Sequence, residues 1–169
     1  NYNKSIEVDP NDANIYLKRG LLLAELKDYK GAKYDYTKVI EITPNNAEAY
    51  FRRGMLLEKL KEYKGAITDF TKSLEIGPDN EIISRIYYVR GGANYKLADA
   101  FFDEETRQLM WKLKSELSAN QIKIVEKTSK IKNGYLKNAY KDGCKAKELG
   151  FHKASHLIEA TGLNSGIEC

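Results

Sequence analysis

Two stretches of the chain match each other at a spacing of 34 residues. They are ANIYLKRGLLLAELKDYKGAKYDYTKVIEITPNN, residues 13–46, and AEAYFRRGMLLEKLKEYKGAITDFTKSLEIGPDN, residues 47–80. The matched pairs include Tyr16 and Tyr50, Arg19 and Arg53, Gly20 and Gly54, Ala32 and Ala66, Asp35 and Asp69, and Pro44 and Pro78. A self-match of this length at one fixed period is the signature of a repeat protein.

The repeat resembles the tetratricopeptide repeat (TPR), a helix–turn–helix unit of the same length. That family places an aromatic residue early in its first helix and a small residue four positions later. It places an alanine at the start of its second helix and a proline at its close. Tyr16, Gly20, Ala32 and Pro44 occupy those positions in the first stretch. The resemblance implies an all-α fold, a right-handed superhelix (α-solenoid) of TPR helix–turn–helix repeats with a C-terminal capping helix.

The helices of both repeats can be placed from their boundary residues. First helices are expected over residues 13–26 and 47–60, and second helices over residues 29–42 and 63–76. Asp12 and Asn46 suit N-caps, since their side chains can accept hydrogen bonds from unpaired backbone N–H groups. Pro44 and Pro78 should end the second helices, because proline lacks the helix donor and disfavours helix in the residue before it.

Two features inside the repeats predict close contacts between paired helices. Gly20 and Gly54 lie within helices, where glycine costs about 1 kcal/mol relative to alanine. We expect the partner helix to approach closely there, with Ala32 and Ala66 as the small residues opposite. Arg19 and Asp35 recur as Arg53 and Asp69, and each pair is predicted to join the two helices of one repeat.

The whole chain is expected to form a single TPR domain, with the following divisions. Residues 1–12 are expected to be the end of a preceding repeat, so the chain is expected to be part of a longer protein. The other divisions are repeat 1 at 13–46, repeat 2 at 47–80, a degenerate repeat 3 at 81–118, a degenerate repeat 4 at 119–150, and a capping helix at 151–162. The segment Tyr87-Tyr88-Val89-Arg90-Gly91 repeats the Tyr-x-x-Arg-Gly signature, and Asp142 aligns with Asp35 when Ala139 is set on Ala32.

Residues 98–137 admit two interpretations. In the first, helices near 103–117 and 119–132 complete a third repeat and open a fourth, ahead of a second helix at 138–149. In the other, they are an insertion between the two halves of a single third repeat. Their excess length, close to one period, favours the first interpretation.

Composition and charge narrow the possible functions. The chain has 42% hydrophobic and 31% charged residues and no run of about 18 apolar residues that would predict a membrane span. Its two cysteines, Cys144 and Cys169, do not make a disulfide framework, which favours a reducing, cytoplasmic compartment. Residues 1–80 are balanced, whereas residues 106–153 carry 12 Lys and Arg against four carboxylates.

The resemblance also implies a function, which is protein or peptide binding in the concave groove lined by the first helices. The expected peptide-binding residues are Asn14, Leu17, Lys18, Leu21 and Glu25 from the first repeat, Phe51, Arg52, Met55 and Lys59 from the second, and Tyr88, Val89, Tyr95 and Lys96 from the third. A partner segment with apolar anchors and some acidic groups would suit this surface. Some family members clamp the C-terminal carboxylate of chaperone tails with lysines and asparagines. Leu17 and Leu21 stand at clamp positions here, so chaperone-tail binding is not expected.

Two alternatives to peptide binding stay open. The basic helices of residues 106–153 could bind nucleic acid or another anionic surface, or the chain could be a structural or dimerisation module of a larger protein. No phosphate loop, nucleophile elbow, Cys-x-x-Cys pair or zinc-protease motif occurs, so no catalytic residue, cofactor or metal site is expected. His152 and His156 share a helix face and could bind metal with a cysteine, but packing or surface roles are the expected ones.

Overall fold

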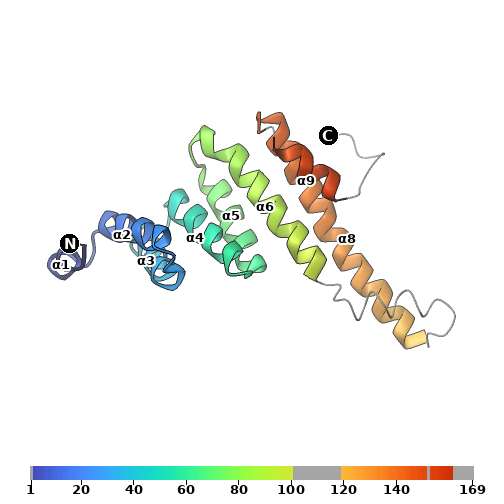
Figure 1. Cartoon of the computed structure of the whole chain (residues 1–169), viewed down its shortest axis with the longest axis horizontal. Helices are drawn as coiled ribbons and strands as arrows, with labels where there is room; N and C mark the ends of the chain where they lie inside the picture. Colours follow the sequence, from blue (N-terminus) through green and yellow to red (C-terminus); the bar gives the residue numbers. More distant parts are fainter. Residues whose placement is uncertain (1, 101–118, 152, 162–169) are drawn as a thin grey trace. The chain divides into compact units, whose positions relative to one another are not determined.

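The computed structural model of the protein describes residues 2–100, 119–151 and 153–161 (Figure 1). The helices are α1 (Tyr2–Val8), α2 (Ala13–Glu25), α3 (Tyr29–Ile42), α4 (Ala47–Lys59), α5 (Tyr63–Ile76), α6 (Asn80–Ala100), α8 (Ala119–Glu148) and α9 (Ala154–Ala160). No strand occurs in these ranges, so the all-α class is confirmed for them. The chain divides into two compact units, residues 1–86 and 87–169, and α6 contributes to both.

The first unit follows the 34-residue period closely. α2 and α4 begin at equivalent residues, as do α3 and α5, and the predicted bounds are confirmed to within one residue. The Asp12 side chain accepts a hydrogen bond from the Asn14 amide at 2.8 Å, which confirms it as an N-cap. Between the paired helices, Lys27 and Lys61 adopt left-handed φ values of 64° and 63°, so both hairpins turn in the same way.

α3 forms the centre of the first unit because it packs on both α2 and α4. Val39 joins Tyr16 of α2 and Ala49 of α4 in one buried cluster. Ala32 and Tyr36 join Leu56 of α4 in a second cluster. Each hairpin therefore buries its apolar face against its neighbour, as expected of a stacked repeat.

The interior glycines do mark close approaches, but their predicted neighbours were wrong. A Cβ built on Gly20 would lie 2.8 Å from the Tyr36 ring, and one on Gly54 would lie 2.7 Å from the Phe70 ring. The expected opposite residues were Ala32 and Ala66. The aromatic residue one helical turn further along the second helix takes that place instead, because its long side chain reaches across the hairpin.

The predicted arginine–aspartate pairs are confirmed in both repeats. Arg19 donates two hydrogen bonds to the Asp35 carboxylate at 2.6 and 2.8 Å. Arg53 does the same to Asp69 at 2.7 and 2.8 Å. The hydrogen bond with Asp35 is the main cause that raises the pKa of Arg19 above its ordinary value. Both arginines also lie over the tyrosine three residues earlier, at 5.7 and 5.6 Å from the ring centroids.

The second unit contains a third pair of the same kind. Arg90 of α6 donates to the Asp142 carboxylate of α8 at 2.7 and 2.9 Å, and its guanidinium lies 5.2 Å from the Tyr87 centroid. Burial alone would lower the pKa of Arg90, but the hydrogen bond and charge of Asp142 outweigh it. The partners are 52 residues apart in sequence, compared with 16 in the first two repeats. This contact favours the interpretation in which residues 98–137 are an insertion between the two halves of a single third repeat. The length of that segment had favoured the other interpretation, in which its helices complete a third repeat and open a fourth.

The expected separate helices at 119–132 and 138–149 are one continuous helix, α8. The segment between them holds Gly134 and no proline. One glycine costs a helix only about 1 kcal/mol, which is too little to break it. The expected helix at 103–117 lies outside the described residues.

The C-terminal end of the second unit packs on α8. α9 begins at Ala154, three residues later than expected, and packs against α8. Cys144 is buried and disulfide-bonded, with a partner outside the described residues. A cytoplasmic compartment stays a prediction. None of the described helices is both long and apolar enough to cross a membrane.

Candidate functional site

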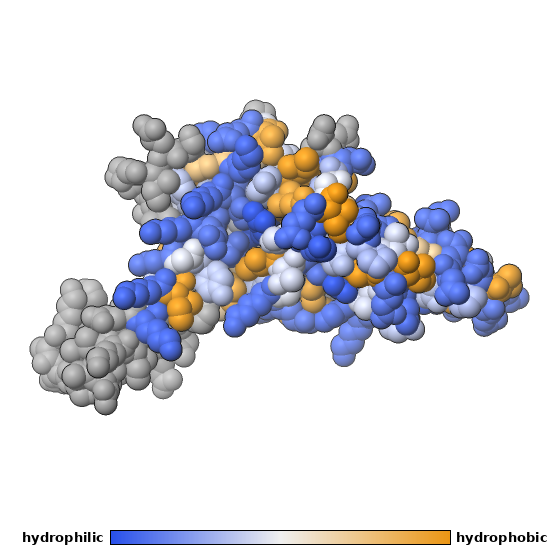
Figure 2. Space-filling model, turned by 180° about the vertical axis from the view of Figure 1, so that it is seen from behind, coloured by the Kyte–Doolittle hydropathy of each residue, from blue (hydrophilic) through white to orange (hydrophobic). Residues whose placement is uncertain are grey.

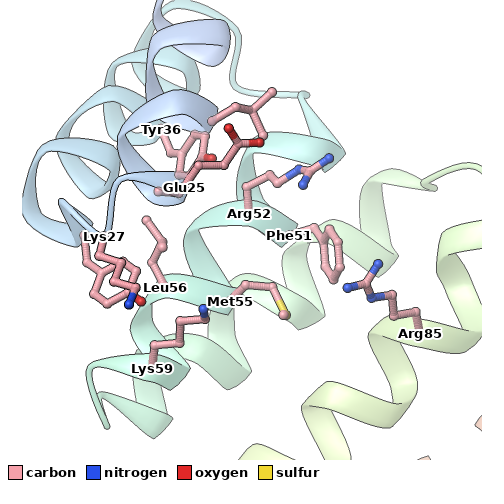
Figure 3. A pocket seen from close by; sticks show the side chains of 12 residues that line it. Glu25, Lys27, Tyr36, Phe51, Arg52, Met55, Leu56, Lys59 and Arg85 are labelled. Carbon is pink, nitrogen blue, oxygen red and sulfur yellow. The ribbon is translucent and has the colours of Figure 1, made fainter.

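A groove of about 390 Å³ opens between the two repeats of the first unit (Figure 3). Its lining residues are Leu21, Ala24, Glu25, Lys27, Tyr29, Tyr36, Phe51, Arg52, Met55, Leu56, Lys59 and Arg85. They come from α2, the turn that follows it, α3, α4 and the first part of α6. We call this set the basic groove.

The floor of the basic groove is apolar and built from the repeat core. Leu56 and Tyr36 belong to one buried cluster, and Phe51, which is 5% exposed, packs against Phe70 with ring centroids 6.2 Å apart. Burial raises the pKa of Tyr36 to about 12, so its phenol stays neutral throughout the physiological range. Because the core holds these side chains in place, the floor is formed before any partner arrives.

The rim of the basic groove carries four cations and one carboxylate. The cations are Lys27, Arg52, Lys59 and Arg85, and the carboxylate is Glu25. Arg52 pairs with Glu48 at 3.0 Å, and both side chains are about two-fifths exposed. Lys59 lies 5.3 Å from the Tyr29 centroid.

Arg85 lies next to the apolar floor of the groove. Its guanidinium lies 5.8 Å from the Phe51 centroid, and Figure 3 shows it beside that ring. Neither Arg85 nor Lys27 forms an ion pair with any residue that the structure describes. The groove therefore offers uncompensated positive charge above an apolar floor.

The thirteen predicted groove residues separate into three groups. Leu21, Glu25, Phe51, Arg52, Met55 and Lys59 do line the basic groove. Asn14 and Lys18 are exposed outside it, and Leu17 packs against both core clusters of the first unit. Leu17 is partly buried because it lies between those two clusters.

Four predicted residues belong to the second unit. Tyr88 packs against Phe151, with ring centroids 4.8 Å apart, so its ring is half-buried under the segment before α9. Val89 and Tyr95 are also half-buried, and Lys96 is exposed. A peptide-binding role for these four stays a prediction.

Sequence reasoning missed Arg85, although a signal for it was present. Arg85 lies six residues before Gly91, as Asn14 lies six residues before Gly20. The register that selected Asn14 in the first helix would have selected Arg85 in the third. The three extra residues before the third signature obscured this equivalence. Lys27 and Tyr29 were missed because they lie in the turn and at the start of α3, outside the first helices.

Of the two histidines that share a helix face in the sequence, only His156 lies in the described part of the chain. His156 is largely exposed and lies 3.9 Å from Glu159. The described residues hold no group of three or more potential metal ligands. His152 lies outside them.

Family models match the first part of the chain. Models described as tetratricopeptide repeat match residues 1–34 and 47–80, and one described as TPR repeat matches residues 20–61. Together they run from residue 1 to residue 80. No curated protein sequence shows significant similarity to the chain.

Solved structures with a similar fold include TPR domains. The first TPR of Spaghetti (RPAP3), bound to the HSP90 peptide SRMEEVD, has a TM-score of 0.62 at 17% identity, and the match covers 91% of this chain and 93% of that one. The Arabidopsis OM64 TPR domain has a TM-score of 0.62 at 17% identity, with 90% and 96% covered. YrrB, described as a TPR protein with an unusual peptide-binding site, has a TM-score of 0.51 at 23% identity, with 95% and 81% covered. These likenesses show the fold.

Proposed function

Because the chain is a tetratricopeptide repeat protein, we propose that it is a non-catalytic interaction scaffold that binds a peptide segment of a partner protein in the basic groove. The observation that supports this most directly is the combination of a preformed apolar floor with unpaired cations at its rim. Spaghetti and YrrB, which share the fold, are described as peptide-binding TPR proteins.

The partner segment should carry an apolar anchor next to acidic residues. Met55 and Leu21 present apolar surface that an aliphatic or aromatic side chain would cover. A carboxylate beside that anchor would reach Arg85 or Arg52, and charge-assisted hydrogen bonds of this type are roughly twice as strong as neutral ones. A neighbouring hollow of about 160 Å³ shares Phe51 but is lined by Glu48 and Asp79, so it is not suited to acidic groups.

A chaperone-tail clamp is not the mode of binding that we propose. Leu17 is packed in the core and Leu21 is part of the apolar floor, so these two positions offer no polar group to a terminal carboxylate. Recognition of an internal segment through side chains is therefore the mode we propose. A TPR chain of this kind needs no cofactor to act in this way.

Selection from a random peptide display library on the whole 169-residue chain tests this proposal. The selected peptides should combine acidic residues with an apolar anchor and should bind with lower affinity to an Arg85→Glu variant. The expected loss is tenfold or more, which corresponds to about 1.4 kcal/mol. Lys64→Glu is a matched control, because Lys64 is exposed on α5 and does not line the groove.

Two results would count against peptide binding in the groove. One is a set of selected peptides whose affinity falls equally in the Arg85→Glu and Lys64→Glu variants. The other is selection of peptides without acidic residues, which would retain a peptide-binding role but remove the charge complementarity that places it here.

A further inference from the structure

A row of lysines runs along α8 in the second unit. Lys127, Lys130, Lys137 and Lys141 are all exposed. At 3.6 residues per turn they project within a sector of about 80°, and at 1.5 Å per residue they extend over about 21 Å. We call these four residues the lysine stripe.

The lysine stripe faces away from the packed side of α8. Ala139 and Ala146 are fully buried, and Asp142 is 5% exposed in its pair with Arg90. The helical period places these three on average about 135° from the stripe. The stripe is therefore free of the contacts that hold α8 in its unit.

No carboxylate with a described side chain compensates the stripe. α8 contains eight lysines and three carboxylates. Asp142 is committed to Arg90, and Glu148 pairs with Lys145 at 2.9 Å. The four lysines of the stripe form no ion pair with any residue in the described ranges. An exposed row of uncompensated like charges attracts an extended anion.

The surroundings of the stripe favour a phosphate backbone over a protein or a membrane. Asn133, Gly134 and Asn138 are exposed along it, and Ile131, at 39% exposure, is the only large apolar side chain there that is clearly exposed among those described. Protein interfaces use clustered apolar anchors, and interfacial membrane helices need a continuous apolar face. Neither is present among the side chains of α8 that the structure describes on this side.

The kind of side chain indicates contact with phosphates and not with bases. Lysine acts as a point charge on phosphate, whereas base recognition uses bidentate arginine or amide groups. Single strands are bound by stacking on exposed aromatic rings, but Tyr135 is half-buried and Tyr140 is 7% exposed. We propose that the lysine stripe binds the phosphate backbone of a nucleic-acid duplex without sequence preference, a function separate from peptide binding in the basic groove.

Fluorescence anisotropy with a labelled 20-base-pair DNA duplex of random sequence tests this. If all four lysines contact phosphates, log affinity should fall with log salt with a slope of about −3.6, an affinity loss of roughly 100-fold between 50 and 200 mM salt. Combined substitution of Lys127, Lys130, Lys137 and Lys141 with glutamine should reduce the slope to near zero and lower the affinity at 50 mM salt by more than tenfold.

A charge-matched control separates the stripe from net charge. Substitution of Lys4, Lys30, Lys61 and Lys64 with glutamine removes the same charge from exposed positions of the first unit. This control should bind the duplex within about threefold of the unaltered chain. Equal losses in both variants, or no duplex binding at 50 mM salt by a chain that is folded by circular dichroism, would overturn the proposal. Binding to vesicles containing phosphatidylserine without binding to duplex would also overturn it.

Discussion

Replacing Gly54 with alanine should destabilise the first unit, although the same change at an ordinary helix position would stabilise it. An added Cβ would lie 2.7 and 2.9 Å from two atoms of the Phe70 ring and 3.3 Å from the Asp69 Cβ. Favourable carbon–carbon contacts lie at about 3.5–4.0 Å. The ring or the whole of α5 would have to move by almost 1 Å, and Phe70 is fully buried in the core.

The expected magnitude follows from two opposing terms. Alanine gains about 1 kcal/mol over glycine in a helix interior. Overpacking a well-packed core costs about 1–3 kcal/mol. The net effect should be a loss of about 1 kcal/mol in the free energy of opening α4 and α5, and Gly20→Ala should behave in the same way beside Tyr36.

Gly134→Ala in α8 is the control. It has no atom within 4 Å of the added Cβ and should therefore stabilise α8 by up to about 1 kcal/mol. Hydrogen exchange followed by mass spectrometry measures both effects, because it reports the opening free energy of each helix separately. A gain in protection of α4 and α5 in Gly54→Ala, equal to the gain of α8 in Gly134→Ala, would refute the steric argument.

Three further changes test the pairs, caps and core. Asp142→Ala should destabilise the second unit by about 3 kcal/mol in thermal unfolding, because Arg90 would stay mostly buried without the Asp142 carboxylate. A loss below about 1 kcal/mol would show that the pair does not join α6 to α8. Asn46→Ala should cost about 1 kcal/mol in urea unfolding, since the cap that accepts from the Ala49 amide is lost, and an unchanged midpoint would contradict this. Tyr36→Phe should change the pH dependence of stability. Since the pKa of Tyr36 is about 12 in the folded chain and 10 when unfolded, the unfolded phenol ionises first, and stability should fall from pH 10 to pH 12 by about 2 kcal/mol more in the unaltered chain than in the variant. Parallel curves for the two proteins would exclude that effect.

Local signals in the sequence were sufficient to place the helices of the first two repeats. The 34-residue period placed α2 to α5 to within one residue, because each boundary is set by groups close in sequence, such as the Asp12 cap. The pairing of Arg19 with Asp35 could also be predicted, since the same two residue types recur at the same separation. Six of the residues that line the basic groove could be predicted from their positions in the first helices of the two repeats.

The sequence by itself therefore determined the all-α class, the hairpins and the internal ion pairs of the first two repeats. Only the tertiary structure decided the rest. It showed that Arg90 meets Asp142 across 52 residues, because nothing local records which distant helix returns to complete a hairpin. It also placed Arg85 beside Phe51 and set the rings of Tyr36 and Phe70 against the interior glycines. These contacts depend on how far long side chains reach between helices. A repeat period shows which residues are equivalent in the sequence, but it does not show which side chains meet in space.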